Sequence, residues 1–201
     1  VAFFVGMIIA LQMAYQMVKL SAEIYIPNVV AVSLTRELAP VLTALIVAGR
    51  IGAGITAEIG SMAVTEQVDA LRAFAVNPVK YLVVPRFLAL VVMLPVLTIF
   101  ADLIGIVGGY MICVLKLSVG HSMYINMVLE SLSIKDFMTG LIKTIFFGMI
   151  IAIVGCHQGL SVKGGAEGVG KATTVSVVIS FIMIIITDCM FTTMFYFVFN
   201  S

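Results

Sequence analysis

The sequence contains no tryptophan and few charged residues. Only 10% of its 201 residues are charged and 62% are apolar, whereas a soluble domain has about 25% charged and about 45–50% apolar residues. A chain of this length cannot hide that apolar excess in a core, because much of its side-chain surface stays exposed after folding. The excess must therefore face lipid, which excludes a soluble enzyme, a nucleic-acid-binding protein and a disordered chain.

Cysteine is scarce, and neither sign of charge predominates. Lys and Arg number 11 and Asp and Glu 10, giving a net charge of +1, which does not indicate a polyanionic partner such as nucleic acid. The three cysteines, Cys113, Cys156 and Cys189, are far apart in apolar runs without a CxxC spacing. This pattern favours buried reduced thiols over a disulfide framework or a metal site.

Long apolar runs are what the sequence has in excess. A membrane-spanning helix needs about 20 mostly apolar residues, and the sequence has five long apolar runs, at residues 1–18, 34–64, 81–115, 137–160 and 173–199. They are too long and too uniformly apolar for strands of a membrane barrel, which alternate over about ten residues. We therefore predict an all-α membrane protein with five transmembrane helices in a single domain, residues 1–201.

The positions of the basic residues predict the orientation of these helices. Loops 65–86 and 161–171 hold five Lys and Arg residues, slightly more than the loops on the opposite side. An excess of positive charge marks the cytoplasmic side of a membrane protein. This places loop 65–86 in the cytoplasm and the mixed, amphipathic segment 116–136 in the periplasm.

The loop between the second and third apolar runs has the pattern of a short amphipathic helix. Thr65 is suited to cap its N-terminus, and Glu66 and Asp69 occupy the first turn, where the helix dipole favours acids. Asn77-Pro78 supplies a stop. The pattern fits either a helix lying passively at the lipid interface or a docking helix for a cytoplasmic partner.

Several charged residues lie inside the predicted spans. A charge at the bilayer centre costs roughly 2.5–3.5 kcal/mol even on a lenient scale, so these groups must face protein or water and be paired. They are Arg36, Glu37, Arg50 and Glu58 in the second run, Asp102 in the third, Lys143 in the fourth and Asp188 in the fifth.

Three interpretations of these intramembrane charges stay open. Arg50 and Glu58 share one side of a helix and favour structural ion pairs with Asp102 or Asp188. A polar-lined substrate cavity is the sharper interpretation for Arg36, Glu37 and Lys143, which lie nearer one membrane face. Acids and bases also alternate among the spans, as a proton relay requires.

Two glycine patterns occur in the sequence, one typical of helix packing and one resembling a phosphate-binding loop. Gly105 and Gly109 form a GxxxG pair, which fits internal packing and a subunit interface equally well. Residues 165–171 match the GxxxxGK pattern of a phosphate-binding loop, but Ala172 replaces the required Ser or Thr, and no strand precedes it. We therefore expect no cofactor on this chain, and any ATP-hydrolysing subunit to be a separate polypeptide.

One long motif resembles a known family. The run at residues 36–45, followed by Ala48-Gly49-Arg50-Ile51-Gly52-Ala53, Thr56-Ala57-Glu58-Ile59-Gly60 and Thr65-Glu66-Gln67, is similar to the MlaE (YrbE) permeases. These are the membrane subunits of ABC transporters that work with MCE-domain proteins. The resemblance covers essentially the whole chain, including Asn77-Pro78, Pro85-Arg86-Phe87 and residues 171–174.

The resemblance implies partners and a substrate. The permease would be a homodimer and not itself an enzyme, each copy docking a cytoplasmic ATPase (MlaF-like) that binds ATP and Mg²⁺ and carries a STAS-domain protein (MlaB-like). A periplasmic MCE-domain hexamer (MlaD-like) would sit above it. The complex would lie in the inner membrane of a Gram-negative bacterium and move phospholipids between inner and outer membranes, maintaining outer-membrane lipid asymmetry.

The resemblance also implies site residues. The loop helix corresponds to the family's coupling helix, with Glu66, Asp69, Leu71 and Arg72 facing the ATPase. The residues matching the family's lipid-binding cavity are Phe3, Leu11, Arg36, Glu37, Leu38 and Lys143. Arg50, Glu58, Asp102 and Asp188 would form an intramembrane polar network.

The loop departs from the pattern of importers, and the N-terminus departs from that of the family. The loop differs from the EAA signature of importers, so importer-type docking details do not transfer. Family members begin with an interfacial helix, whereas this chain begins at Val1 inside an apolar run, without an initiator Met or a basic n-region. We therefore expect that helix and the natural N-terminus to lie upstream.

Two other classes of protein compete with this interpretation. A proton-driven secondary transporter would use Glu58, Asp102, Lys143 and Asp188 as a relay, and it would usually show inverted repeats, which the sequence does not display. A structural scaffold for a larger membrane assembly is the third class.

Overall fold

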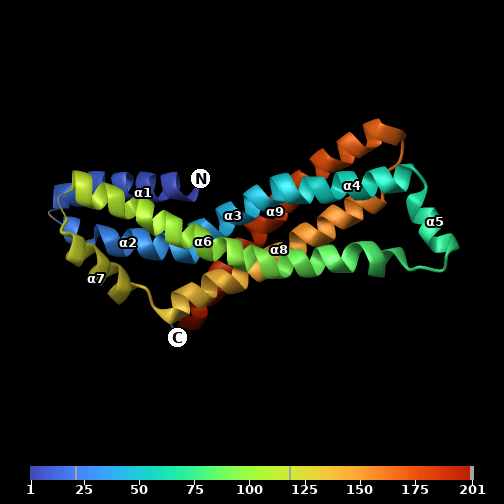
Figure 1. Ribbon diagram of the computed structural model, residues 1–201. Coiled ribbons are helices and arrows are strands. Elements are labelled where there is room, and N and C mark those ends of the chain that lie inside the picture. Colours follow the sequence, from blue (N-terminus) through green and yellow to red (C-terminus); the bar gives the residue numbers. More distant parts are fainter. Residues whose placement is uncertain (21, 118, 200–201) are drawn as a thin grey trace. The chain divides into compact units, whose positions relative to one another are not determined.

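The computed structural model describes residues 1–20, 22–117 and 119–199 of the chain. These residues form helices and short connections, without a strand in the described ranges. The α-helices are α1 (Ala2–Met17), α2 (Ile26–Ser33), α3 (Ala39–Val47), α4 (Ala53–Val64), α5 (Gln67–Ala73), α6 (Val84–Lys116), α7 (His121–Ser131), α8 (Ile134–Leu160) and α9 (Gly165–Phe199) (Figure 1). The predicted all-α architecture is confirmed.

Within the described ranges, four continuous helices are long and apolar enough to cross a membrane. They cover Ile26–Val64, Val79–Lys116, Ile134–Leu160 and Gly165–Phe197. Helix α1 is apolar but has 16 residues, fewer than the roughly 20 that a span needs. The count of five spans therefore stays a prediction, with α1 as the span in question.

The second apolar helix begins earlier than its predicted start at residue 34. Pro27, in the stretch between the first two predicted runs, lies in the first turn of α2, which begins at Ile26. Proline is accommodated there because the first turn has no internal partner for its missing N–H. The proline thus starts this helix instead of separating it from the preceding one.

Three π-helical turns interrupt the long helices. They lie at Leu34–Leu38, Ala48–Gly52 and Val79–Val83. Such turns break the regular i→i−4 hydrogen-bond ladder and are frequent at functional sites. Here the first turn holds Arg36 and Glu37, and the second holds Arg50, so two of the predicted groups of intramembrane charges lie in distorted helix.

The described chain divides into two compact units, each with its own packing. The first contains Val1–Thr43 and Val96–Ile142, and the second contains Ala44–Pro95 and Lys143–Ser201. In the first unit the core joins α1, α2, the C-terminal part of α6 and α7, through buried residues such as Ala10, Val30, Ile112 and Tyr124 (Figure 1).

Close backbone contacts in the first unit depend on glycine. A methyl group at Gly6 of α1 would meet the backbone carbonyl of Gly105 in α6, and one at Gly108 would meet the carbonyl of Phe3. A methyl group at Gly109 would lie 2.9 Å from a side-chain carbon of Val30. The glycines of the predicted GxxxG segment therefore serve internal helix packing within the chain.

In the second unit a buried hydroxyl group links three helices. Thr56 of α4 lies 3.0 Å from the carbonyl oxygen of Gly155 in α8 and 2.9 Å from the hydroxyl of Ser176 in α9. Gly159 of α8 provides a second close contact, because a methyl group there would lie 2.8 Å from Ile59. Helices α8 and α9 thus both pack against α4, and α9 runs along it.

The predicted amphipathic segment 116–136 contains helix α7. Tyr124 and Val128 are buried in the first unit, whereas Ile125 and Leu129 are 40% and 70% exposed. The exposed face thus also carries large apolar side chains, as expected for a helix in contact with lipid. Its predicted periplasmic location stays a prediction.

Substituting Gly6 tests the close packing of α1 on α6. We expect Gly6→Ala to lower the thermal stability of the detergent-solubilised protein by about 1–3 kcal/mol, the usual range for overpacking, because the added methyl group meets backbone that cannot rotate away. Gly54→Ala is the matched control, since nothing lies within 4 Å of the added group. Equal melting temperatures for the two variants would contradict this packing.

Candidate functional site

Arg36 lies in the first π-helical turn and has an acidic partner that the sequence pattern did not reveal. Its guanidinium is 3.8 Å from the carboxylate of Asp136, and the two side chains are 31% and 23% exposed. Asp136 is held in turn by Ser133, whose hydroxyl donates to the carboxylate at 2.7 Å and accepts the Asp136 backbone N–H at 3.2 Å. Ser133 thus caps the start of α8 and holds the carboxylate in place, while the long ion pair leaves the guanidinium able to take another acceptor.

The other predicted cavity residues of the first unit lie in different environments. Glu37 and Leu38 share the π-helical turn with Arg36, and Leu38 packs against the hydrophobic core. Phe3 of α1 is partly buried, whereas Leu11 is 48% exposed. Five of the six predicted cavity residues thus belong to the first unit, and Lys143 belongs to the second.

Lys143 is fully buried and forms a compact ion pair. Its ammonium group donates to the Asp188 carboxylate at 2.9 Å and to the Thr192 hydroxyl at 2.7 Å, with the lysine side chain 0% exposed. A buried charge is tolerated only when paired and hydrogen-bonded in this way. Lys143, predicted to line a cavity, therefore joins α8 to α9.

The four residues of the predicted polar network lie in separate environments. Asp188 pairs with Lys143, and the Glu58 carboxylate lies 2.8 Å from the guanidinium of Arg86. Arg50 is exposed. Asp102 is 3% exposed, and its Oδ1 atom has no hydrogen-bond partner among the described residues. The network of these four residues stays a prediction, while the structure gives Glu58 and Asp188 the partners Arg86 and Lys143.

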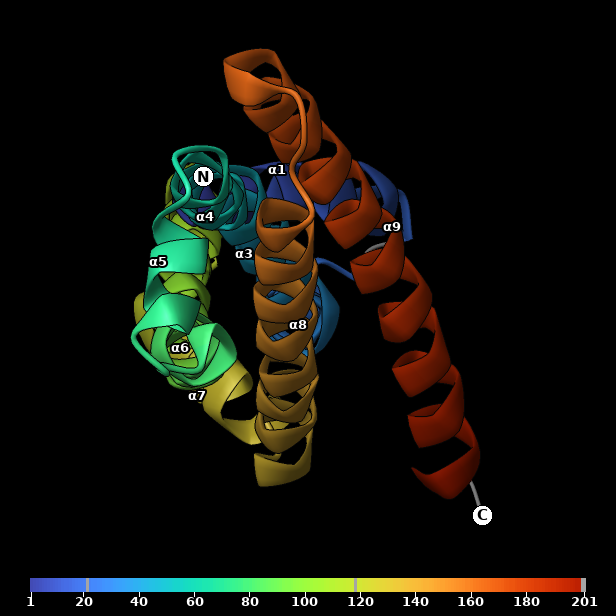
Figure 2. The same cartoon turned by 90° about the vertical axis from the view of Figure 1, so that its right-hand side faces the viewer.

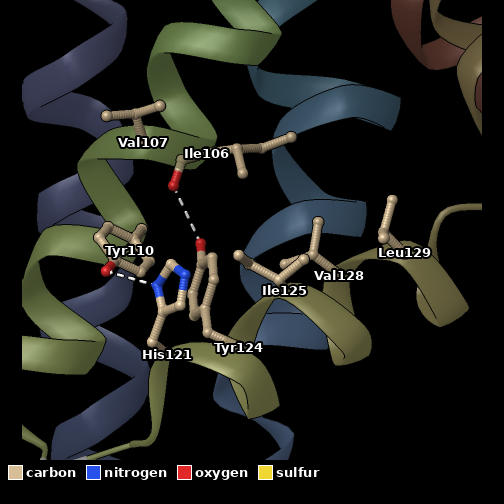
Figure 3. A pocket seen from close by; sticks show the side chains of 8 residues that line it. All are labelled: Ile106, Val107, Tyr110, His121, Tyr124, Ile125, Val128 and Leu129. Carbon is tan, nitrogen blue, oxygen red and sulfur yellow. Dashed lines mark hydrogen bonds between the residues drawn. The ribbon is translucent and has the colours of Figure 1, made fainter.

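An apolar hollow between α6 and α7 is a feature that sequence reasoning missed. It has a volume of about 320 Å³, near the lower end of the range of small-molecule sites. Figure 3 shows its lining residues, which are Ile106, Val107, Tyr110, His121, Tyr124, Ile125, Val128 and Leu129.

The polar atoms around this hollow are paired with one another. The Tyr110 hydroxyl is 2.8 Å from Nδ1 of His121, and the Tyr124 hydroxyl donates to the Ile106 carbonyl at 2.9 Å (Figure 3). Burial raises the pKa of Tyr124 above its usual range, so its hydroxyl stays protonated and remains a donor. The lining thus favours an apolar group over a charged one.

Helix α5 is the predicted coupling helix, but it is shorter than its sequence pattern suggested. It covers Gln67–Ala73, and Thr65 does not cap it. The Thr65 hydroxyl donates instead to the Ser61 carbonyl at 2.9 Å, at the end of α4. Glu66 takes the N-cap position with a left-handed backbone (φ 60°) and without a side-chain cap. The predicted N-cap at Thr65 is therefore wrong, because its hydroxyl is used by the preceding helix.

The far end of α5 closes with a Schellman motif. The N–H of Val76 bonds to the Leu71 carbonyl and that of Ala75 to the Arg72 carbonyl, both at 3.0 Å. Ala75 adopts a left-handed backbone (φ 58°), as this motif requires. Asn77 then caps the next helix by accepting the Val79 N–H at 2.9 Å. Helix α5 thus ends at Ala73, before the predicted stop at Asn77-Pro78, and Asn77 serves the helix that follows.

The side chains of α5 divide between an anchored face and an exposed face. Val68 is buried and Leu71 half-buried, whereas Glu66, Asp69 and Arg72 are exposed. Asp69 and Arg72 form an exposed ion pair of 2.8 Å. Phe74, just after the helix, is 80% exposed. Three of the four predicted coupling residues are thus exposed, and the ring of Phe74 is exposed beside them.

The GxxxxGK-like segment is helical. Residues 165–171 form the first turns of α9, and helix α8 precedes them. A phosphate-binding loop has a strand before it and wraps its backbone around the phosphates, which these helical turns do not do.

The chain is similar to known membrane permeases. The protein-family description "Permease MlaE" matches residues 1–194. A probable ABC transporter permease protein of Rickettsia prowazekii is 46% identical over 194 residues, covering 96% of this chain and 75% of that protein. Proteins with the same description from Synechocystis and from Pyropia yezoensis are 44% and 40% identical, covering 92% and 93% of this chain and 70% and 71% of their own lengths.

Breaking the buried pair of Lys143 tests whether it stabilises the fold. Lys143→Met should destabilise the protein by about 3–5 kcal/mol, because the Asp188 carboxylate loses its buried cation. Adding Asp188→Leu should recover a large part of the loss, since no charge is then left uncompensated. The measurement is thermal unfolding of the purified protein in detergent. A double variant no more stable than Lys143→Met would contradict a structural role.

Proposed function

The chain belongs to the MlaE family of ABC transporter permeases, and from this premise we propose that it moves phospholipids between the inner and outer membranes of a Gram-negative envelope. This transport would maintain the lipid asymmetry of the outer membrane. The observation that supports it most directly is an Arg36 guanidinium held only loosely, 3.8 Å from Asp136, in a π-helical turn of an apolar helix. Such a group suits a phosphate bound within apolar surroundings.

The energy for transport comes from a partner subunit. An ABC transporter permease works with an ATPase, and in our proposal helix α5 docks it through Glu66, Asp69, Leu71 and Arg72. The ATPase is MlaF-like, binds ATP and Mg²⁺ and carries a MlaB-like STAS protein. The permease acts as a homodimer in the inner membrane, below a periplasmic MlaD-like MCE hexamer.

The lipid is held by groups of two kinds. Arg36 attracts the phosphate, with Glu37 in the same turn, while Phe3, Leu11 and Leu38 contact the acyl chains. Lys143 would join the phosphate contacts only by leaving Asp188, because its ammonium group is fully buried and already donates to that carboxylate. Arg36 is therefore the primary phosphate ligand in this proposal.

Transport follows from compression of the lipid cavity. ATP binding closes the two ATPases, and α5 transmits the movement to α4, with which it is continuous except for Thr65 and Glu66. Helix α9 packs along α4 and moves with it. The lipid is then displaced toward the MCE channel or released in the opposite direction.

Substituting Arg36 tests the phosphate site. Arg36→Gln should reduce co-purified phospholipid and ATP-dependent lipid transfer at least about 10-fold, since a charge-assisted hydrogen bond contributes about 1.5–3 kcal/mol. Lys116→Gln, which removes an exposed charge elsewhere in the same unit, is the control. Bound lipid is quantified by mass spectrometry, and transfer by a fluorescent phospholipid in proteoliposomes. Unchanged retention in Arg36→Gln, or transport driven by a pH gradient without ATP, would contradict the proposal.

Reversing the charge of Arg72 tests docking. Its ion pair with Asp69 is two-thirds exposed, so its loss should change stability by less than about 1 kcal/mol. Arg72→Glu should nevertheless weaken ATPase binding and lower the lipid moved per ATP several-fold, while bound phospholipid stays at the wild-type level. Co-purification stoichiometry and ATP turnover measure this effect. Wild-type coupling in Arg72→Glu would refute the docking role of α5.

A further inference from the structure

A single arginine joins the two helices on either side of α5. The Arg86 guanidinium lies near the start of α6 and reaches Glu58 of α4 at 2.8 Å. The arginine side chain is 20% exposed and that of Glu58 63% exposed. Figure 2 shows α5 between the adjoining ends of α4 and α6. The ion pair thus crosses the opening that α5 spans.

Arg86 makes a second bond, to backbone rather than to a side chain. Its Nη1 donates to the Leu82 carbonyl at 2.7 Å, while Nη2 faces Glu58. Leu82 lies in the π-helical turn Val79–Val83, where the N–H of Val84 bonds to the Val79 carbonyl and the regular ladder is broken. The planar guanidinium can serve both acceptors at once, so Arg86 links the π-helical turn, α6 and α4.

An unfilled space lies beside the ion pair between α4 and α6. Beside the ion pair is an open hollow of about 630 Å³, lined also by Met62, Tyr81, Leu82, Pro85 and Ala89. Tyr81 is 62% exposed. Since apolar side chains leave this space unfilled, the ion pair is a direct connection between the two helices at its edge.

The connections of α5 to its neighbours are tight turns. Glu66 and Ala75 bracket the helix, and both adopt left-handed backbone conformations although neither is glycine. Two backbone hydrogen bonds lock the turn at Ala75, and buried Val68 anchors the helix itself. Helices α4, α5 and α6 therefore form a frame with stiff corners, closed on its open side by Arg86 and Glu58.

We propose that Arg86 is a positioning residue for energy coupling, which through Glu58 holds this frame rigid so that force on α5 moves α4 and α6 instead of bending the loop. This inference rests on the proposed docking of an ATPase to α5. Removing the pair leaves α5 able to yield under load, so ATP is hydrolysed with less lipid moved.

The experiment compares four variants in the complete complex with its ATPase. Arg86→Gln and Glu58→Gln each remove one partner, the double variant Glu58→Arg with Arg86→Glu exchanges the charges, and Lys80→Gln removes an exposed charge from the same π-helical turn as a matched control. Proteoliposomes with a fluorescent phospholipid give lipid moved per ATP hydrolysed. Hydrogen exchange at the amides of α5 reports the rigidity of the frame without reference to transport.

Each single variant should lower lipid moved per ATP about 5-fold and speed hydrogen exchange in α5 about 10-fold, with ATPase stoichiometry and melting temperature close to wild type. The charge exchange should recover part of both effects, limited by the lost bond to the Leu82 carbonyl. Lys80→Gln should match wild type. These results together support the proposal.

Two results would overturn it, and a third concerns the proposed function instead. Unchanged exchange in α5 of Arg86→Gln shows that the pair does not hold the frame. If a single variant no longer binds the ATPase or no longer unfolds in a cooperative melting transition, the Arg86–Glu58 pair has a general structural role instead. If wild-type complex shows no ATP-dependent lipid movement, the proposed function fails, while hydrogen exchange still decides whether Arg86 stiffens α5.

Discussion

A charge within an apolar helix must be compensated by another group of the protein, because neither lipid nor an apolar core can solvate it. Lys143 meets this requirement completely, with Asp188 at 2.9 Å and Thr192 at 2.7 Å. Arg36 meets it only in part, since Asp136 is 3.8 Å away. The same requirement thus separates a lysine that holds helices together from an arginine that can still bind an anion.

Three arginines lie in, or bond to, turns that depart from regular α-helix. A π-helical turn rotates the residues after it relative to those before it, so Arg36 and Glu37 in Leu34–Leu38 and Arg50 in Ala48–Gly52 do not follow the 3.6-residue periodicity of the whole helix. Arg86 depends on a third such turn, because it donates to the carbonyl of Leu82 within Val79–Val83. Each of these three arginines is therefore positioned by a π-helical turn.

This explains which features could be predicted from the sequence. Apolar run length was sufficient for the four long helices among the described residues, and Asn77-Pro78 indicated a break between α5 and the next helix, although α5 itself ends earlier, at Ala73. The partner of Glu58 could not be predicted, since regular helical spacing favoured a shared face with Arg50 and gave no indication of Arg86. The N-cap of α5 was also predicted wrongly, because Thr65 lies between two helices. Its hydroxyl donates to the Ser61 carbonyl of the earlier helix, α4.

The length of α5 limits how it can act. An isolated helix of seven residues is not stable in water, where even favourable sequences need about 12–15 residues. Its exposed Asp69–Arg72 pair contributes little, so its shape is set by buried Val68, by the turns at Glu66 and Ala75, and by the helices that these turns join. A partner that binds α5 therefore binds a surface whose geometry α4 and α6 determine. Any force on that surface passes into the same two helices through which its shape is maintained.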